Sequence, residues 1–138
     1  MIPFKLRKIG DPYKHKQELT GEWKGRSAGG CANYRDSYGN NPKYGFTLNV
    51  DSHVLIELKG PKQYQMGFDL NMVVGANKES HLYFSHKSSG RYRSGFVVMP
   101  VEMTAGTYSI TPTTFKPGQE GPFFLKVKSS SPFKLEKL

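Results

Sequence analysis

The sequence predicts an all-β domain, an antiparallel β-sandwich of about eight strands. Apolar residues alternate with period two over most of the chain, which is typical of half-buried strands. The 138 residues include 15 glycines and 9 prolines, and tight turns between short strands use these residues for their special backbone angles. No strand–helix–strand rhythm is visible, which argues against a parallel nucleotide-binding sheet.

The expected strands follow one another between clear turn signals. Tyr44, Phe46, Leu48 and Val50 share one face of a strand, and Gly60-Pro61 ends the strand that follows it. In chain order, we expect strands at residues 18–23, 44–50, 54–58, 68–74, 81–85, 93–99, from 108 onward, and 123–127. The turn-rich residues 87–90 are expected to form a hairpin loop.

The first 17 residues differ from the rest of the chain. They are basic, they contain the turn signal Asp11-Pro12, and their segment 3–9 (PFKLRKI) is similar to segment 132–138 (PFKLEKL). Similarity at a separation of one domain length is typical of tandem copies. We therefore interpret residues 1–17 as a linker with the tail of a preceding copy, and 18–138 as the domain. Chance, or two unrelated basic edge strands, is the alternative.

Composition limits the environment and the partners of the chain. No stretch approaches the roughly 20 apolar residues that cross a bilayer, and Met1 is not followed by the pattern of a signal peptide. Cys31 is the only cysteine, so no internal disulfide forms. We expect an intracellular location, cytoplasmic or also nuclear. The net charge of +9 favours acidic partners, although a merely solvated basic surface is the alternative.

The sequence gives little support for a catalytic centre or a metal site. Cys31 lies in the glycine-rich segment 27–33, but none of the four histidines sits in a recognisable partner motif for a thiol nucleophile. Only Asp36 and Asp51 lie in expected loops that could be neighbours, which is too few carboxylates for a calcium cage. No Cys/His set has zinc spacing. We expect no catalytic centre, no metal site and no cofactor, and we interpret Cys31 as a buried structural thiol.

The basic residues fall into groups on expected turns. Lys59 and Lys62 surround Gly60-Pro61, and the candidate hairpin loop 86–93 carries a second set: Lys87, Arg91, Tyr92 and Arg93. Such loops meet anionic headgroups, with tyrosine at the boundary. Nucleic acid is a weaker candidate, because no RNA-binding aromatic signature is present. Scattered solvated charge is again the alternative.

Two segments resemble the C2-like domain of calpains, also called domain III. The first contains Gly21-Glu22-Trp23, Ala28-Gly29-Gly30-Cys31-Ala32-Asn33 and Asn41-Pro42. The second contains Gly106-Thr107-Tyr108, Pro112-Thr113-Thr114-Phe115 and Phe123-Phe124-Leu125-Lys126-Val127. The resemblance covers residues 18–128 and implies a C2-like sandwich. It implies structural roles for the motif residues: Trp23 as a core anchor, Gly29 and Gly30 in a tight turn, and Asn33 as a side-chain cap. Cys31 and Pro42 belong to the same structural motif.

Departures from the family pattern refine this expectation. The protease core with its catalytic Cys, His and Asn is absent, no EF-hand pattern follows, and the acidic loop of conventional calpains has no counterpart, which argues against calcium regulation. The chain is most similar to the distal C2-like domain of PalB-type calpains. The resemblance implies a parent that is a papain-like cysteine endopeptidase.

Two functions from different classes remain open. The first is a non-catalytic regulatory domain that positions the protease core or docks it on a partner, in contact with other domains of the same chain and a preceding C2-like copy. The second is a calcium-independent module that binds anionic phospholipid or another polyanion. The salt dependence of binding separates them, because a basic patch loses affinity as salt rises.

Overall fold

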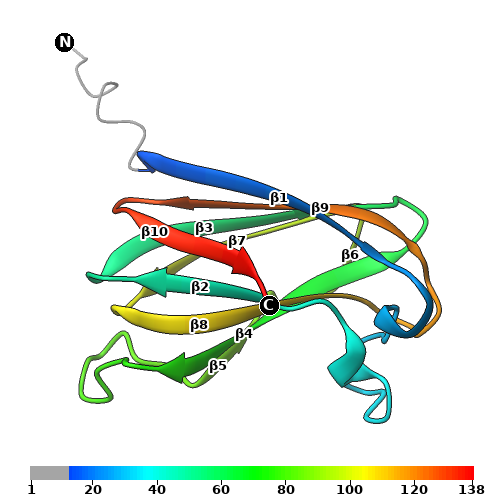
Figure 1. The fold of residues 1–138 in the computed structure, drawn as a ribbon, viewed down its shortest axis with the longest axis horizontal. Helices are drawn as coiled ribbons and strands as arrows, with labels where there is room; N and C mark the ends of the chain where they lie inside the picture. The colour runs from blue at the N-terminus through cyan, green and yellow to red at the C-terminus, as the bar shows by residue number, and fades with distance from the viewer. Residues whose placement is uncertain (1–12) are drawn as a thin grey trace.

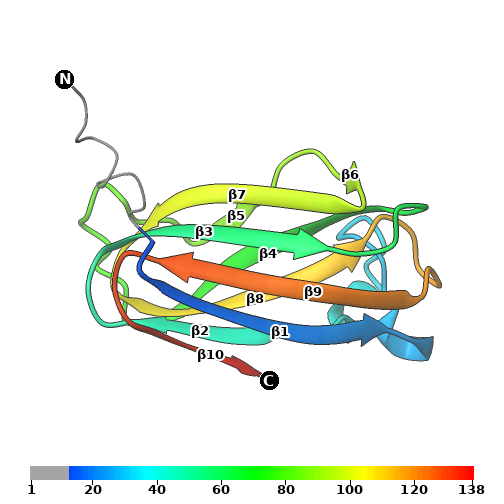
Figure 2. The ribbon, with the colours of Figure 1, turned by 90° about the horizontal axis from the view of Figure 1, so that it is seen from above.

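Ten β-strands and two short 3₁₀ helices form in residues 13–138, the part of the chain that the computed structural model describes. The strands build two antiparallel sheets that face each other as a sandwich (Figure 1, Figure 2), so the predicted fold class is confirmed. In spatial order, the four-stranded sheet contains β1 (His15–Trp23), β9 (Gly121–Ser129), β3 (Ser52–Lys59) and β7 (Phe96–Met103). The six-stranded sheet contains β10 (Phe133–Lys137), β2 (Tyr44–Leu48), β8 (Gly106–Thr114), β4 (Gln65–Val74) and β5 (His86–Ser88), with β6 (Arg93–Ser94) also paired to β4.

Alternating burial along the strands creates the core. Val54, Ile56 and Leu58 of β3 are fully buried, whereas His53 and Lys59 on the same strand are exposed. Strand β3 therefore sends every second side chain between the sheets, where apolar burial stabilises the fold. The large aromatic side chains that are fully buried come from both sheets: Trp23, Tyr44, Phe46, Phe68, Tyr108 and Phe123.

Trp23 joins the two sheets at the end of β1. Its ring packs against Phe123 of the neighbouring β9, with 4.6 Å between ring centroids. Its Nε1–H donates a hydrogen bond of 3.1 Å to the carbonyl oxygen of Pro112, which belongs to β8 in the opposite sheet. One side chain therefore contributes both apolar packing and a satisfied polar link across the core.

The segment between β4 and β7 differs most from the prediction. The strand expected at residues 81–85 is wrong, because local hydrogen bonds hold turns there instead. The Asn77 carbonyl Oδ1 accepts from the Glu79 N–H at 2.9 Å, and the Ser80 hydroxyl accepts from the Leu82 N–H at 3.1 Å. Strand β5 begins only at His86.

Gly95 divides the single strand expected at residues 93–99 into two. Its φ of +73° is a left-handed conformation that glycine adopts without strain. The chain leaves the six-stranded sheet with β6 and enters the four-stranded sheet with β7. The Gly95 carbonyl accepts a 2.9 Å hydrogen bond from the Gly60 N–H, which ties this corner to the connection after β3.

Two expected core residues lie outside the core. Val50 and Val74 are 54% and 62% exposed. Strand β2 ends at Leu48, before Val50. A register shift between Met72 and Val74 breaks the alternation of β4, so Val74 no longer continues its buried face.

Strand β10 was not predicted, and it completes the side of the sandwich next to β1. It pairs with β2, and the Leu135 carbonyl accepts a 3.1 Å hydrogen bond from the Gln17 side-chain amide of β1. Strand β1 begins at His15, three residues before the strand expected at 18. The segment 3–9, interpreted as the tail of a preceding copy, lies outside the described residues.

The connection after β1 folds over the six-stranded sheet. It carries the 3₁₀ helices η2 (Gly25–Ser27) and η3 (Tyr38–Asn40), and the Tyr38 hydroxyl donates to Asp69 Oδ2 of β4 at 2.6 Å. Burial and this hydrogen bond raise the pKa of Tyr38. Buried Cys31 donates its backbone N–H to the Phe115 carbonyl at 3.2 Å.

Asn41, and not Asn33, caps this connection. The Asn41 Oδ1 accepts from the Gly29 N–H at 3.0 Å, and its Nδ2 donates to the carbonyls of Gly30 and Tyr38 at 2.8 and 2.9 Å. Asn41 is 4% exposed, whereas Asn33 is an exposed residue, so the role expected of Asn33 belongs to Asn41. Pro42 follows it, half-buried, before β2.

The two glycines are required here by close packing. A Cβ on Gly29 would lie 2.1 Å from the Ser37 carbonyl oxygen. Gly30 has a φ of +78°, and a Cβ there would lie 2.6 Å from the Pro117 nitrogen.

Replacing Trp23 by Ala should lower the free energy of unfolding by about 3–5 kcal/mol, because the change opens a cavity and leaves the Pro112 carbonyl unpaired. Urea melts followed by circular dichroism measure the loss. Phe124→Ala, which truncates a partly exposed aromatic on β9, is the control and should cost much less. Equal losses for the two variants would contradict the anchoring role of Trp23.

Replacing Asn41 by Ala should lower the free energy of unfolding by about 2–3 kcal/mol, because three backbone groups lose their partner in a buried place. Asn33→Ala is the matched control and should stay within about 0.5 kcal/mol of the wild type. Thermal or urea denaturation of both variants compares them. A larger loss for Asn33→Ala would restore the role that the sequence assigned to it.

Candidate interaction surface

Most of the candidate basic residues gather at one end of the sandwich. Strand β3 ends at Lys59, β4 begins shortly after Lys62, and Arg93 of β6 pairs with Met66 near the start of β4. The Ser94 hydroxyl donates to the Lys62 carbonyl, so the two connections are in contact. Figure 2 shows β3 ending and β9 beginning at the end where β6 lies. The sequence left open whether the two turns share an end, and the hydrogen bonds bring them together.

We define the basic end by seven exposed cationic residues in β3, β6 and the connections at this end: Lys24, Arg26, Lys59, Lys62, Arg91, Arg93 and Lys116. Among residues 13–138, none of them takes part in an ion pair. The nearby Glu120 carboxylate instead accepts the Gly25 N–H at 2.7 Å. The positive charges of this end are therefore available to an acidic partner.

Lys87 lies apart from the basic end. The expected hairpin loop 86–93 is wrong, because these residues form an interrupted edge strand beside β4. Lys87 pairs with Leu70, whereas Arg93 pairs with Met66, about 13 Å away along β4. The Lys87 ammonium lies 5.1 Å from the centroid of the Phe84 ring, a cation–π contact.

Tyr92 is turned into the domain. Its hydroxyl hydrogen-bonds to Thr113 Oγ1, and its ring meets Phe115 edge-on at 5.9 Å. Burial raises its pKa to about 12. A Cβ on Gly67 would lie 2.8 Å from the Tyr92 ring, so the glycine in β4 leaves the space that the ring fills.

Two exposed phenylalanines flank Lys59, and sequence reasoning missed them. Phe96 of β7 and Phe124 of β9 are the cross-strand partners of Lys59 on either side, and they are 45% and 40% exposed. The signal was present in the adjacent pair Phe123-Phe124, because consecutive strand residues face opposite sides. Phe123 is buried, so Phe124 must point outward.

A hollow of about 370 Å³ opens beside Phe124. Its lining comes from the connections after β3 and before β9, and from the adjoining strand residues: Lys59, Gly60, Pro61, Gln63, Glu120, Gly121, Pro122 and Phe124. A Cβ on Gly121 would lie 2.6 Å from Pro61 Cγ, so the two connections are packed together with no room for a side chain.

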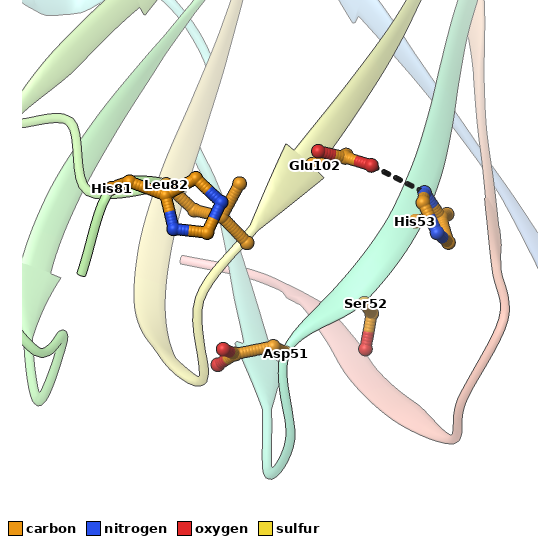
Figure 3. A pocket seen from close by; sticks show the side chains of 6 residues that line it. All are labelled: Asp51, Ser52, His53, His81, Leu82 and Glu102. Carbon is orange, nitrogen blue, oxygen red and sulfur yellow. Dashed lines mark ion pairs between the residues drawn. The ribbon is translucent and has the colours of Figure 1, made fainter.

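A second hollow, of about 230 Å³, lies at the opposite end (Figure 3). His81 and Leu82 face Glu102 and His53 across it, with 3.1 Å between His53 Nδ1 and Glu102 Oε2. The Ser52 hydroxyl bonds to Ser131 and the Val50 carbonyl rather than to His53, so this pair has no serine nucleophile.

Within residues 13–138, no three His, Cys, Asp or Glu side chains are grouped as metal ligands. No helix in this part of the chain is long and apolar enough to cross a membrane.

Comparisons with known proteins agree with the fold. The family model of the calpain large subunit, domain III, matches residues 19–128. Calpain-7 of Sus scrofa is 43% identical, and that of Homo sapiens 42% identical, over 98% of this chain. The calpain-like protease palB/cpr-8 of Neurospora crassa is 26% identical over 97% of it. The chain spans 17% of the length of each of these relatives.

A solved structure supports the architecture alone. The pre-peptidase C-terminal domain of collagenase from Bacillus anthracis superposes with a TM-score of 0.53, at 14% identity, over 82% of this chain and 89% of that one. The sandwich and the family match over residues 19–128 together lead to one conclusion: the chain belongs to the calpain domain III family, a non-catalytic domain of calpain-type cysteine proteases.

Proposed function

We propose that the chain is a docking domain of a calpain-like cysteine endopeptidase, and that it positions the protease core by attaching to an acidic surface. The observation that supports this is the basic end, whose seven exposed cations form no ion pair with any of residues 13–138. Opposite charge raises the rate of encounter and fixes orientation more than it adds affinity. These are the properties that a positioning contact needs.

Neighbouring domains of the same chain are the first proposed partners. Segment 132–138, whose counterpart is segment 3–9, contains β10, an edge strand of the six-stranded sheet. This correspondence supports a preceding C2-like copy, with segment 3–9 as its tail. An intracellular parent protein is part of the proposal, since Cys31 is a buried thiol.

Anionic phospholipid is the alternative partner. Exposed Phe96 and Phe124 beside Lys59 favour it, because aromatic side chains next to cations suit the headgroup boundary. In this alternative the attachment is independent of calcium, and a chelator leaves it intact.

Replacing Lys62, Arg91 and Arg93 together by Ser should weaken binding to poly-L-glutamate by on the order of 100-fold. Each charge near an oppositely charged surface contributes about 1 kcal/mol, and three such contributions multiply to that factor. Biolayer interferometry at about 50 mM salt, repeated at about 300 mM, measures the affinity and its loss by screening. All runs contain a chelator.

The matched control replaces Lys14, Lys78 and Lys134, which lie toward the opposite end, and changes the net charge equally. Its affinity should stay near that of the wild type. Equal weakening by both triple variants would mean that the charge acts without a defined site. Parallel runs with phosphatidylserine vesicles separate the alternatives: binding to vesicles but not to poly-L-glutamate would replace the protein partner with lipid.

A further inference from the structure

The hollow beside Phe124 has the lining of a pocket for one large apolar side chain. Its walls are the rings of Pro61, Pro122 and Phe124, and its volume of about 370 Å³ falls in the range of ligand pockets. Gly60 and Gly121 line it without side chains. Gly121 packs closely against Pro61 Cγ, which holds the two lining connections together, so the pocket exists before any partner arrives.

Lys59 supplies a positive charge at the rim of this pocket. Its neighbours across the sheet are Phe124 on one side and Phe96 on the other. Lys59 is exposed, and a partner that covered Phe96 and Phe124 would also shield an ion pair formed at Lys59, which would then be screened less than one in open solvent. Among residues 13–138 no carboxylate pairs with Lys59. A partner's carboxylate can therefore take that place.

Glu120 also lines the pocket, and its position is compatible with an acidic partner. Its Oε2 accepts the Gly25 N–H at 2.7 Å, so the carboxylate is held toward η2. The exposed cations Lys24 and Arg26 flank Gly25 in the chain, so positive charge stands close to the place where the Glu120 carboxylate is held.

We propose that this pocket binds an acidic peptide segment of a partner protein, with one large apolar side chain in the hollow and an adjacent carboxylate on Lys59. The shape of the site favours a peptide over a membrane. A bilayer receives side chains that protrude from a protein, whereas a hollow receives a side chain that protrudes from the partner. Phe96 adds an apolar contact on the far side of Lys59. This inference rests on the proposed docking function and assigns its recognition site.

A random 12-residue peptide library displayed on phage, selected against the 138-residue chain at low salt, tests the proposal. We expect enriched peptides to combine aspartate or glutamate with a Leu, Ile, Met, Phe or Trp at a fixed spacing. Synthetic copies are then titrated by fluorescence anisotropy against Phe124→Ser and Lys59→Glu. Each change should weaken binding at least about tenfold, since interface contacts in central pockets dominate affinity.

Matched controls carry the same chemical changes at the opposite end. Val74→Ser alters an exposed apolar side chain, and Lys78→Glu reverses an exposed charge. Both should bind within about twofold of the wild type, because they touch no part of the pocket. Circular dichroism verifies that all four variants are folded. Amide chemical shifts of Gly60 and Gly121, read by NMR on the wild-type chain, should move when the peptide is added.

The outcomes separate this proposal from the docking function. Acidic peptides that lack a shared apolar residue, or that bind Phe124→Ser as well as the wild type, overturn the pocket and leave electrostatic docking intact. Selection of neutral peptides, or of none, overturns the pocket as well. If poly-L-glutamate also fails to bind, the proposed docking function is overturned together with the pocket. Unmoved Gly60 and Gly121 resonances, with a peptide bound, place the peptide elsewhere and overturn the assignment.

Discussion

The contact of Trp23 with Phe123 and the Pro112 carbonyl is the interaction on which the rest of the structure depends. It joins the first strand to the ninth by ring packing and to the opposite sheet by a hydrogen bond. The connection to η2 leaves β1 immediately after Trp23, and β9 carries Phe124 outward immediately after Phe123. The packing of Trp23 on Phe123 therefore also determines where the chain enters the basic end and to which side Phe124 points.

Much of the fold could be predicted from the sequence because period-two burial survives in most strands. The spacing of Val54, Ile56 and Leu58 was enough to predict that they share a buried face, and all three are fully buried. The failures have two causes: local backbone geometry that the apolar pattern does not reveal, and a weak apolar signal. The turns held by Asn77 and Ser80 replaced an expected strand. Strand β10, short and charged, has only Leu135 buried, so its apolar signal is weak.

The candidate surface was predictable in part. Lys59, Lys62, Arg91 and Arg93 were identified by charge alone, but their assembly depends on contacts between two connections that are distant in sequence. Lys87 and Tyr92 shared the same segment and were assigned to the same loop. Pairing with β4 separates Lys87 from the cluster, and the space left by Gly67 draws Tyr92 inward. Sequence proximity does not determine the direction of a side chain where the strand is interrupted.

Gly95 constrains the position of Lys62 in the basic end. A Cβ at this position would lie 3.0 Å from the Lys62 Cγ, and the positive φ would strain any replacement. A mutation that disturbed the crossing between the sheets would therefore also displace a cationic side chain. Selection for a stable fold would thus preserve the backbone position from which Lys62 extends, without any selection for binding. The corner is a fixed point of the backbone, and the charge that it carries can change during evolution without a change of fold.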